Sequence, residues 1–321
     1  MAINLMTLEP QRISRSLKGK FVFLYGDPGI GKTTLASQFP KSLILGFEQG
    51  TNALDNVYVA QMKTWQDWKT VVGQLTKNEA LKEKFETVCI DTTDMMWEML
   101  VRKICAAHDV VRIGEIQWGQ GYEEAKQEFI SGLDALSKSG YGIVFISHST
   151  EKTFKDDRGQ EYTKIVPALP NRPFEVVNKM VDLVGYIRLI PIDDEGNKER
   201  FVFFRGDERF LAKSRFQYIE PKVKFSYDEI ARAIQEACDK EAELHGAKAS
   251  EEGNSYLELN FDELIEQAKI VFTQATDAGK VDEVSKILAD IFGKPTKFSE
   301  ILPQDVDKLH QALTEIRTTI L

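Results

Sequence analysis

Short apolar runs alternate with longer stretches of helical periodicity over the first two thirds of the chain. Each run is apolar at consecutive positions, which is typical of strands buried on both faces by flanking helices. We predict such strands at residues 21–25, 42–47, 86–91, 142–147, 182–190 and 199–205. Helical spacing of apolar residues predicts helices at residues 65–75, 94–107 and 122–138. The alternation predicts an α/β fold with a mainly parallel sheet.

One segment interrupts this alternation. Residues 151–166 place the turn sequence Asp157-Arg158-Gly159 between two short arms of β-prone residues. A turn flanked in this way predicts a projecting β-hairpin.

The last third of the chain has a different pattern. A helix is predicted at residues 227–244, followed by a polar, glycine- and serine-containing linker at residues 246–255. Three apolar stripes of helical period then predict a small bundle, at residues 261–272, 281–291 and 306–316. We therefore divide the chain into an α/β core at 1–225, a helix and linker at 226–258, and a helical bundle at 259–321.

Charge is distributed unevenly over these parts. The net charge is −9, and residues 226–321 hold 20 acidic and 10 basic side chains against 30 and 31 in residues 1–225. The bundle is therefore acidic, and overall charge gives no support for nucleic-acid binding. No apolar run approaches the roughly 20 residues of a membrane span, and the three cysteines lack metal-ligand spacing. We expect a soluble intracellular protein without a membrane partner or a zinc site.

The segment from Gly26 to Thr33 matches the phosphate-binding pattern G-x-x-x-x-G-K-[ST] between a predicted strand and a helix-prone stretch. In such a loop, backbone N–H groups surround the phosphates, Lys32 reaches the β and γ phosphates, and the Thr33 hydroxyl binds Mg²⁺. We therefore predict binding of a nucleoside triphosphate with Mg²⁺. The predicted contacts are Gly26, Asp27, Pro28, Gly29, Ile30, Gly31, Lys32, Thr33 and Thr34.

A P-loop also requires a carboxylate at a strand end to hold the water shell of Mg²⁺. The run Thr87-Val88-Cys89-Ile90-Asp91 is an apolar strand that ends in Asp91, which we predict as the second metal-site residue. Asp94 is a weaker candidate and fits a helix cap better.

Hydrolysis needs a group that orients or deprotonates water, and the strand after the P-loop helix leads directly to Glu48. This position resembles that of the catalytic glutamate in RecA-like ATPases, whereas Asp91 is followed by Thr92 and not by a glutamate. The alternative for Glu48 is a solvent-facing loop carboxylate. The next strand ends in Ser147-His148, where RecA-like proteins place a polar sensor of the γ-phosphate; the alternative for His148 is a residue that only closes the strand.

Further along, Lys213-Ser214-Arg215-Phe216 resembles the K-x-R-F element of RecA-like proteins, whose cations reach the nucleotide of a neighbouring subunit. The resemblance implies that Lys213 and Arg215 act as fingers in a homo-oligomer with ATP at the subunit interface. A basic strand edge is the alternative. The candidate catalytic residues are thus Glu48, Lys32, His148, Lys213 and Arg215.

Together these motifs cover residues 20–216 and resemble the phage ATPases of the AAA_24 type, which include RecA-core recombinases of the Sak group. The resemblance implies a RecA-like core, an ATPase stimulated by DNA, a role in recombination or single-strand annealing, and a location in the cytoplasm of the phage host. It also implies that the loop after the sensor strand contacts single-stranded DNA.

In this chain the hairpin fills that position. Its candidate contacts are two aromatic rings and four cations, Phe154, Tyr162, Lys152, Lys155, Arg158 and Lys164. Four acidic residues bring its net charge to zero, so a solvated hairpin is the alternative. The glycine-rich stretch from Arg112 to Tyr122, which includes Trp118, is a second candidate loop.

These observations support two candidate functions, one as an enzyme and one as an interaction module. The first is an ATP-hydrolysing, DNA-interacting recombination or annealing protein. The second is a nucleotide-switched loader or adaptor, whose acidic C-terminal bundle recruits a protein partner. DNA-stimulated ATP turnover distinguishes them.

Overall fold

The computed structural model describes residues 17, 19–50, 54–245, 261–302 and 305–319. These residues divide into two compact units, one within residues 17–245 and one within residues 261–319. Each unit has a hydrophobic core of its own.

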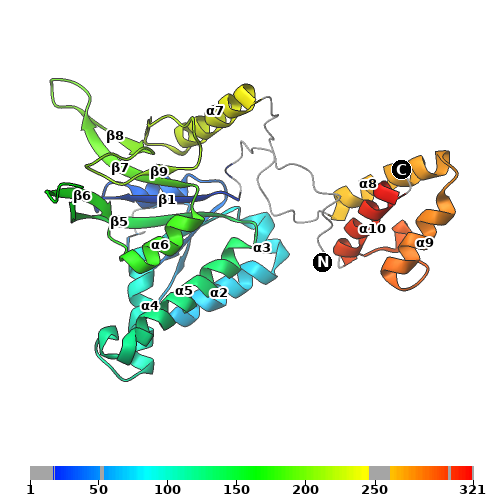
Figure 1. The fold of residues 1–321 in the computed structure, drawn as a ribbon, viewed down its shortest axis with the longest axis horizontal. Coiled ribbons are helices and arrows are strands. Elements are labelled where there is room, and N and C mark those ends of the chain that lie inside the picture. Colours follow the sequence, from blue (N-terminus) through cyan, green and yellow to red (C-terminus); the bar gives the residue numbers. More distant parts are fainter. Residues whose placement is uncertain (1–16, 18, 51–53, 246–260, 303–304, 320–321) are drawn as a thin grey trace. The chain divides into compact units, whose positions relative to one another are not determined.

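The first unit is built on a ten-stranded sheet (Figure 1). Its strands are β1 (Phe21–Gly26), β2 (Ser42–Gly46), β3 (Tyr58–Gln61), β4 (Thr87–Asp91), β5 (Gly142–Lys155), β6 (Glu161–Pro167), β7 (Leu183–Pro191), β8 (Lys198–Phe203), β9 (Lys213–Ser214) and β10 (Lys222–Lys224). Its helices are α1 (Lys32–Ser37), α2 (Trp65–Lys77), α3 (Glu79–Lys84), α4 (Thr93–Ala107), η2 (Ile113–Glu115), η3 (Gln117–Gly119), α5 (Gln120–Ser137), α6 (Asn171–Met180) and α7 (Tyr227–His245).

The strand order is β10-β8-β7-β1-β5-β4-β2-β3, with β6 added to β5 and β9 added to β7. From β7 to β3 the neighbouring strands are parallel, whereas β8, β10, β6 and β9 join antiparallel. The predicted α/β class with a mainly parallel sheet is therefore confirmed.

Helices cover both faces of the sheet, which explains the continuous apolar runs (Figure 1). In β1, Phe23 and Tyr25 pack into the core shared with α2, α4, α5 and α6. Val22 and Leu24 alternate with them and pack into the core shared with α1 and α7.

All six predicted strands and all four predicted helices of this unit, including the one at residues 227–244, are present. Their ends are shifted by at most two residues, except that β5 continues to Lys155. The sequence pattern missed the edge strand β3, the helices α3 and α6, and the short strands β9 and β10. These elements bury few side chains; α6, for example, buries only Pro173 and Val177. Their apolar pattern was therefore too weak to predict them.

The predicted hairpin is present and continues directly from the core. Strand β5 runs without interruption from the sheet through residue 155, and β6 pairs with its outer half in a register that sets Phe154 opposite Tyr162.

Helix α7 is more than a connection to the second unit. Ile230, Ile234 and Cys238 on one of its faces pack into the core beside α1 and β8. The helix thus completes the cover on that face of the sheet, because its amphipathic stripe has an apolar surface to bury. The predicted linker at residues 246–255 lies outside the described residues.

The second unit consists of α8 (Phe261–Asp277), α9 (Val281–Phe292), η4 (Phe298–Glu300) and α10 (Val306–Thr319). The three α-helices match the three predicted stripes. Their shared core is centred on Val271, Leu288, Leu309 and Leu313. None of the helices in the described parts of either unit is long and apolar enough to cross a membrane.

Candidate nucleotide site

The predicted nucleotide residues gather at one edge of the sheet. Gly26 at the end of β1 is in register with His148 on β5, and Gly46 at the end of β2 is in register with Asp91 at the end of β4. Because these strands are parallel, their carboxyl ends meet at this edge. Glu48, two residues beyond β2, lies there as well, since its Oε2 is 3.8 Å from Nε2 of His148.

The P-loop links β1 to α1 through two glycines in the left-handed region. Gly29 has a φ of 77° and Gly31 a φ of 103°, which residues with a side chain rarely adopt. Gly26 is needed for a different reason, because a Cβ atom there would lie 2.8 Å from the carbonyl oxygen of Ile187. These glycines allow the loop to present its backbone N–H groups to an anion.

Lys32 is buried against the loop itself. Its Nζ donates to the carbonyl oxygens of Gly26 and Asp27, each at 3.0 Å. Burial lowers the pKa of Lys32, while the charges of Asp91 and Glu48 oppose that shift. The ammonium is therefore held at the mouth of the loop, beside the acidic groups of the site.

Thr33 and Asp91 form the candidate metal position. The Thr33 hydroxyl donates to Asp91 Oδ2 at 2.7 Å, and Asp91 is only 2% exposed. Burial raises the pKa of Asp91, partly offset by the hydrogen bond from Thr33. The other oxygen, Oδ1, is buried without a partner among the described residues. A hydroxyl and a carboxylate oxygen that lacks a partner are suited to Mg²⁺ and its water shell.

Glu48, His148 and Asp94 form a connected acid–base group. His148 Nδ1 lies 2.9 Å from Asp94 Oδ2, and His148 Nε2 lies 3.8 Å from Glu48 Oε2. The hydrogen bond with Asp94 raises the pKa of His148. Burial would raise the pKa of Asp94, but the hydrogen bond and charge of His148 hold it below its usual value.

Asp94 therefore has a partner that sequence analysis did not assign to it. It lies in the first turn of α4, but the N-cap of this helix is Thr92, so the expected cap role of Asp94 is wrong; its carboxylate faces β5 and orients the ring of His148. Burial raises the pKa of Glu48, which makes that carboxylate a stronger base than a free one.

Lys213 and Arg215 lie away from the P-loop of their own chain. Strand β9 pairs with Leu183 of β7, and Leu183 is in register with Val22 near the start of β1. The P-loop follows the other end of β1. Lys213 donates to the carbonyl oxygen of Asn178, and Arg215 pairs with Asp182 at 3.0 Å. Within one chain these cations do not belong to the nucleotide site.

The hairpin rings contact each other. Phe154 and Tyr162 are stacked with their centroids 5.8 Å apart, and each is more than one third exposed. Lys155 pairs with Glu161 at 3.6 Å, whereas Lys152 reaches back to Asn171 at 2.8 Å. Lys164 is level with Lys152, and Arg158 lies in the exposed turn.

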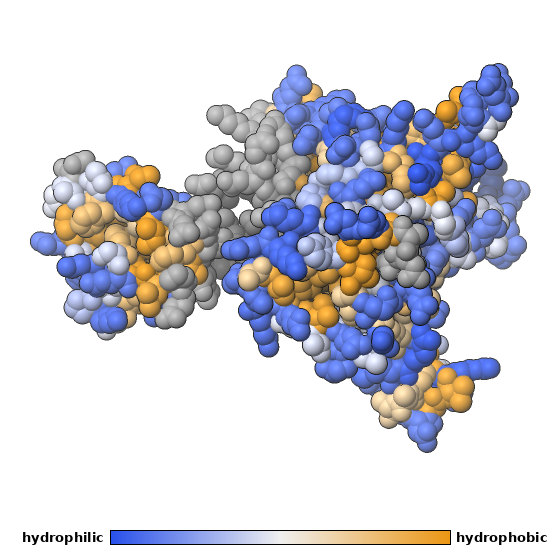
Figure 2. Space-filling view, turned by 180° about the vertical axis from the view of Figure 1, so that it is seen from behind, coloured by the Kyte–Doolittle hydropathy of each residue, from blue (hydrophilic) through white to orange (hydrophobic). Residues whose placement is uncertain are grey.

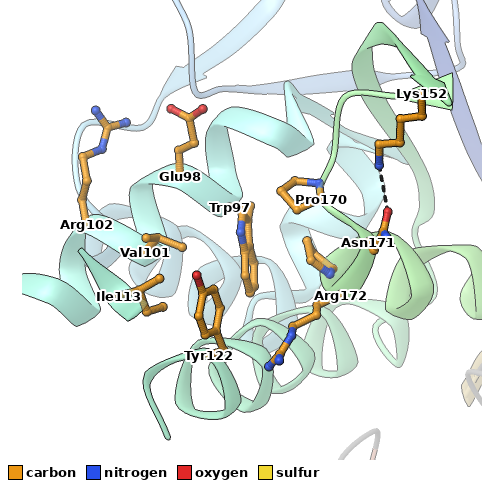
Figure 3. A pocket seen from close by; sticks show the side chains of 11 residues that line it. Trp97, Glu98, Val101, Arg102, Ile113, Tyr122, Lys152, Pro170, Asn171 and Arg172 are labelled. Carbon is orange, nitrogen blue, oxygen red and sulfur yellow. Dashed lines mark hydrogen bonds between the residues drawn. The ribbon is translucent and has the colours of Figure 1, made fainter. Parts of the chain in front are cut away.

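A pocket of about 870 Å³ connects the base of the hairpin with the second candidate loop. Figure 3 shows Lys152 on one side and Tyr122 and Ile113 on the other, with α4 behind them and the start of α6 beside Lys152. Arg172 stacks on the Tyr122 ring, with its guanidinium carbon 4.8 Å from the ring centroid. The structure thus places both candidate loops around one pocket.

The end of the second loop is apolar and exposed. Figure 2 shows hydrophobic residues gathered on this protrusion, at the lower right of that view. Val111 is 87% exposed and Trp118 is 92% exposed.

One cation near the P-loop was missed by sequence analysis. Arg200 of β8 donates from Nη1 to the carbonyl oxygen of Ile30 at 3.2 Å. The two residues are 170 positions apart, and no local motif indicates their contact.

A parallel sheet with this loop, a buried lysine and the Thr33–Asp91 pair at its carboxyl edge defines a P-loop ATPase fold. A family model described as an AAA domain, AAA_24, matches residues 18–216. The match covers more than half of the chain, so the chain belongs to this AAA domain family.

The chain is also similar to a curated protein and a solved structure. It is 28% identical to an uncharacterized protein, YorG, derived from the SPbeta prophage of Bacillus subtilis (strain 168), over 99% of this chain and 98% of that protein. It is 13% identical to a KaiC-like protein, PH0186, of Pyrococcus horikoshii OT3, with a TM-score of 0.39 over 64% of this chain and 85% of that one. The prophage relative and the family match support the resemblance to phage AAA_24 ATPases.

Proposed function

We propose that the protein hydrolyses ATP at its P-loop and uses the cycle to act on single-stranded DNA in phage recombination or annealing, in the host cytoplasm. The observation that carries the proposal is strand β5, because one continuous strand holds His148 at the nucleotide site and Phe154 on the hairpin. A change at the γ-phosphate therefore has a direct covalent route to the hairpin.

In the proposed reaction, Lys32 binds the β and γ phosphates and Thr33 with Asp91 holds Mg²⁺, which neutralises phosphate charge when bound. Glu48 orients a water molecule and accepts its proton. His148 donates a hydrogen bond to the γ-phosphate, and Asp94 fixes the ring that makes this bond. Lys213 and Arg215 act on the nucleotide of a neighbouring subunit in a head-to-tail homo-oligomer.

Single-stranded DNA is proposed to contact the hairpin and the pocket beside it. The outer faces of Phe154 and Tyr162 remain available for bases, because their inner faces contact each other. Arg102, Lys152 and Arg172 line the pocket, and only one acidic residue, Glu98, accompanies them there. Cations and aromatic rings in one groove are typical of single-strand binding.

The deciding experiment measures ATP turnover by the full chain with and without single-stranded DNA at several salt concentrations. We expect stimulation that weakens as salt rises, because phosphate contacts release counterions. Turnover that is unchanged by DNA under all conditions would contradict the recombination role and leave the ATPase itself in place.

One observation favours the second candidate, a nucleotide-switched adaptor. In the C-terminal unit, Ile270 is 59% exposed and Phe272 is 43% exposed on α8, within an acidic part of the chain. An apolar surface with acidic surroundings suits a basic protein partner. This candidate predicts slow turnover that DNA does not stimulate.

A further inference from the structure

A guanidinium lies against the P-loop from a strand that the nucleotide motifs do not include. Arg200 is exposed, and its Nη1 both donates to the Ile30 carbonyl oxygen and lies 2.5 Å from where a Cβ atom of Gly31 would be. No carboxylate among the described residues pairs with Arg200. By contrast, Arg232 of α7 contacts three glutamates, Glu220, Glu229 and Glu236.

The aromatic ring of Phe225 holds this guanidinium in place. The Arg200 guanidinium carbon lies 4.3 Å from the ring centroid, and the Phe225 backbone N–H donates to the Arg200 carbonyl oxygen at 3.1 Å. The edge of the ring also lies 3.2 Å from the Cβ position of Gly31. A cation and a ring are thus fixed together beside the same P-loop glycine.

The surroundings of Arg200 indicate which part of a nucleotide this pair faces. A P-loop points its N–H groups toward the phosphates, and the buried Lys32, which also donates to two loop carbonyl oxygens, lies among the carboxylates of the site. Arg200 is exposed and pairs with none of these carboxylates among the described residues. Lys32 and Thr33 already serve the phosphate and metal positions. Arg200 and Phe225 therefore lie where the nucleoside, rather than the phosphate chain, would pass.

We infer that Arg200 and Phe225 form a platform on which the base of the bound nucleoside triphosphate stacks. Guanidinium groups and aromatic rings both stack on bases through their flat faces. The inference rests on the proposed nucleotide binding at the P-loop and adds to it the residues that bind the base.

The test compares two probes, ATP and inorganic tripolyphosphate, by calorimetric titration of the full chain. The variants are Arg200→Gln, at an exposed position, and Phe225→Leu, which keeps apolar volume in a partly buried one. Each is expected to weaken ATP binding about fivefold or more, the lower end of measured base-stacking effects, and to leave tripolyphosphate binding unchanged.

Lys222→Gln is the matched control. Lys222 also lies over a phenylalanine of the same strand pair, 4.6 Å from the Phe201 ring centroid, and Phe201 points to the opposite face from Arg200. This variant is expected to bind both probes as the parent does.

Three outcomes would overturn the platform while nucleotide binding stands: equal weakening of both probes in Arg200→Gln, unchanged ATP affinity in both variants, or a parent that binds ATP no more tightly than tripolyphosphate. A parent that binds neither probe would overturn the P-loop function and the platform together.

Discussion

The hydroxyl of Thr33 donates to Asp91 Oδ2 at 2.7 Å, although the two residues are 58 positions apart in the chain. This hydrogen bond connects the start of α1 with the end of β4. It leaves Asp91 Oδ1 buried and without a partner among the described residues. A buried carboxylate oxygen without a partner destabilises a fold unless a ligand satisfies it, so this position fits a metal site better than a structural one.

Replacing Lys32 with alanine is expected to abolish ATP turnover, because the ammonium is the direct counter-charge for the β and γ phosphates. Lys41→Ala is the control, since Lys41 is half exposed and pairs with Glu86 away from the loop. Phosphate release measures both variants. Parental turnover in Lys32→Ala would contradict the whole assignment of the site.

Glu48→Gln is expected to retain ATP binding while slowing turnover at least about tenfold, since general-base catalysis contributes roughly 10² to 10⁴. Binding and turnover are measured separately, by titration and by phosphate release. Glu86→Gln serves as a control at a partly buried carboxylate that pairs with Lys41 away from the loop. If Glu48→Gln turns over at the parental rate, Asp94 becomes the next candidate base.

The His148–Asp94 pair predicts a pH-dependent contribution to stability. Because the pKa of His148 is raised in the folded chain, its protonated ring contributes to stability. This contribution is present at a pH below 6.5, the ordinary pKa of histidine, and is lost as the pH rises through the raised pKa of His148. Because the pKa of Asp94 is lowered in the folded chain, its ionised carboxylate also contributes to stability. This contribution is present at a pH above 3.8, the ordinary pKa of aspartate, and is lost as the pH falls through the lowered pKa of Asp94.

Asp94→Asn is therefore expected to lower the thermal unfolding midpoint more at pH 5.5 than at pH 9, as measured by circular dichroism. A difference between parent and variant that stays constant over this range would show that the charge of His148 does not contribute.

Lys213→Ala and Arg215→Ala are expected to lose ATP turnover while each chain still binds ATP, because the cations act on a neighbour. Mixing tests this. A Lys32→Ala chain, which keeps its Lys213 and Arg215, should partly restore turnover to an Arg215→Ala chain, which keeps its P-loop. Because Arg215 pairs with Asp182, unfolding midpoints are measured alongside. A lowered midpoint without rescue at any ratio would indicate a structural role.

Replacing both Phe154 and Tyr162 with alanine is expected to weaken single-stranded DNA binding by one to three orders of magnitude, since stacking is worth roughly 1–3 kcal/mol per base. Fluorescence anisotropy of a labelled oligonucleotide measures this with ATP present. Lys155→Ala should weaken DNA binding less than the double variant does, because Lys155 already pairs with Glu161. Unchanged affinity of the double variant for DNA would contradict binding by the hairpin rings and would make the loop around Trp118 the next candidate for the DNA contact.

The sequence by itself determined the P-loop and those strands and helices that bury a clear apolar pattern. Strand β1, residues 88–90 of β4 and residues 143–146 of β5 are apolar at consecutive positions because both faces are covered, and this local pattern is independent of strand order. The P-loop is equally local, since its glycines, Lys32 and Thr33 lie within eight consecutive residues.

Only the tertiary structure decided which side chains meet across the sheet. The Asp94–His148 pair, the Arg200–Ile30 contact and the stacking of Phe154 on Tyr162 depend on strand order and register. The same register places Lys213 and Arg215 at the opposite edge from the P-loop. No short-range pattern encodes the Asp94–His148 and Arg200–Ile30 contacts, because the residues of each pair are far apart in the chain. The hairpin itself is local, but its register, which sets Phe154 opposite Tyr162, was not predicted.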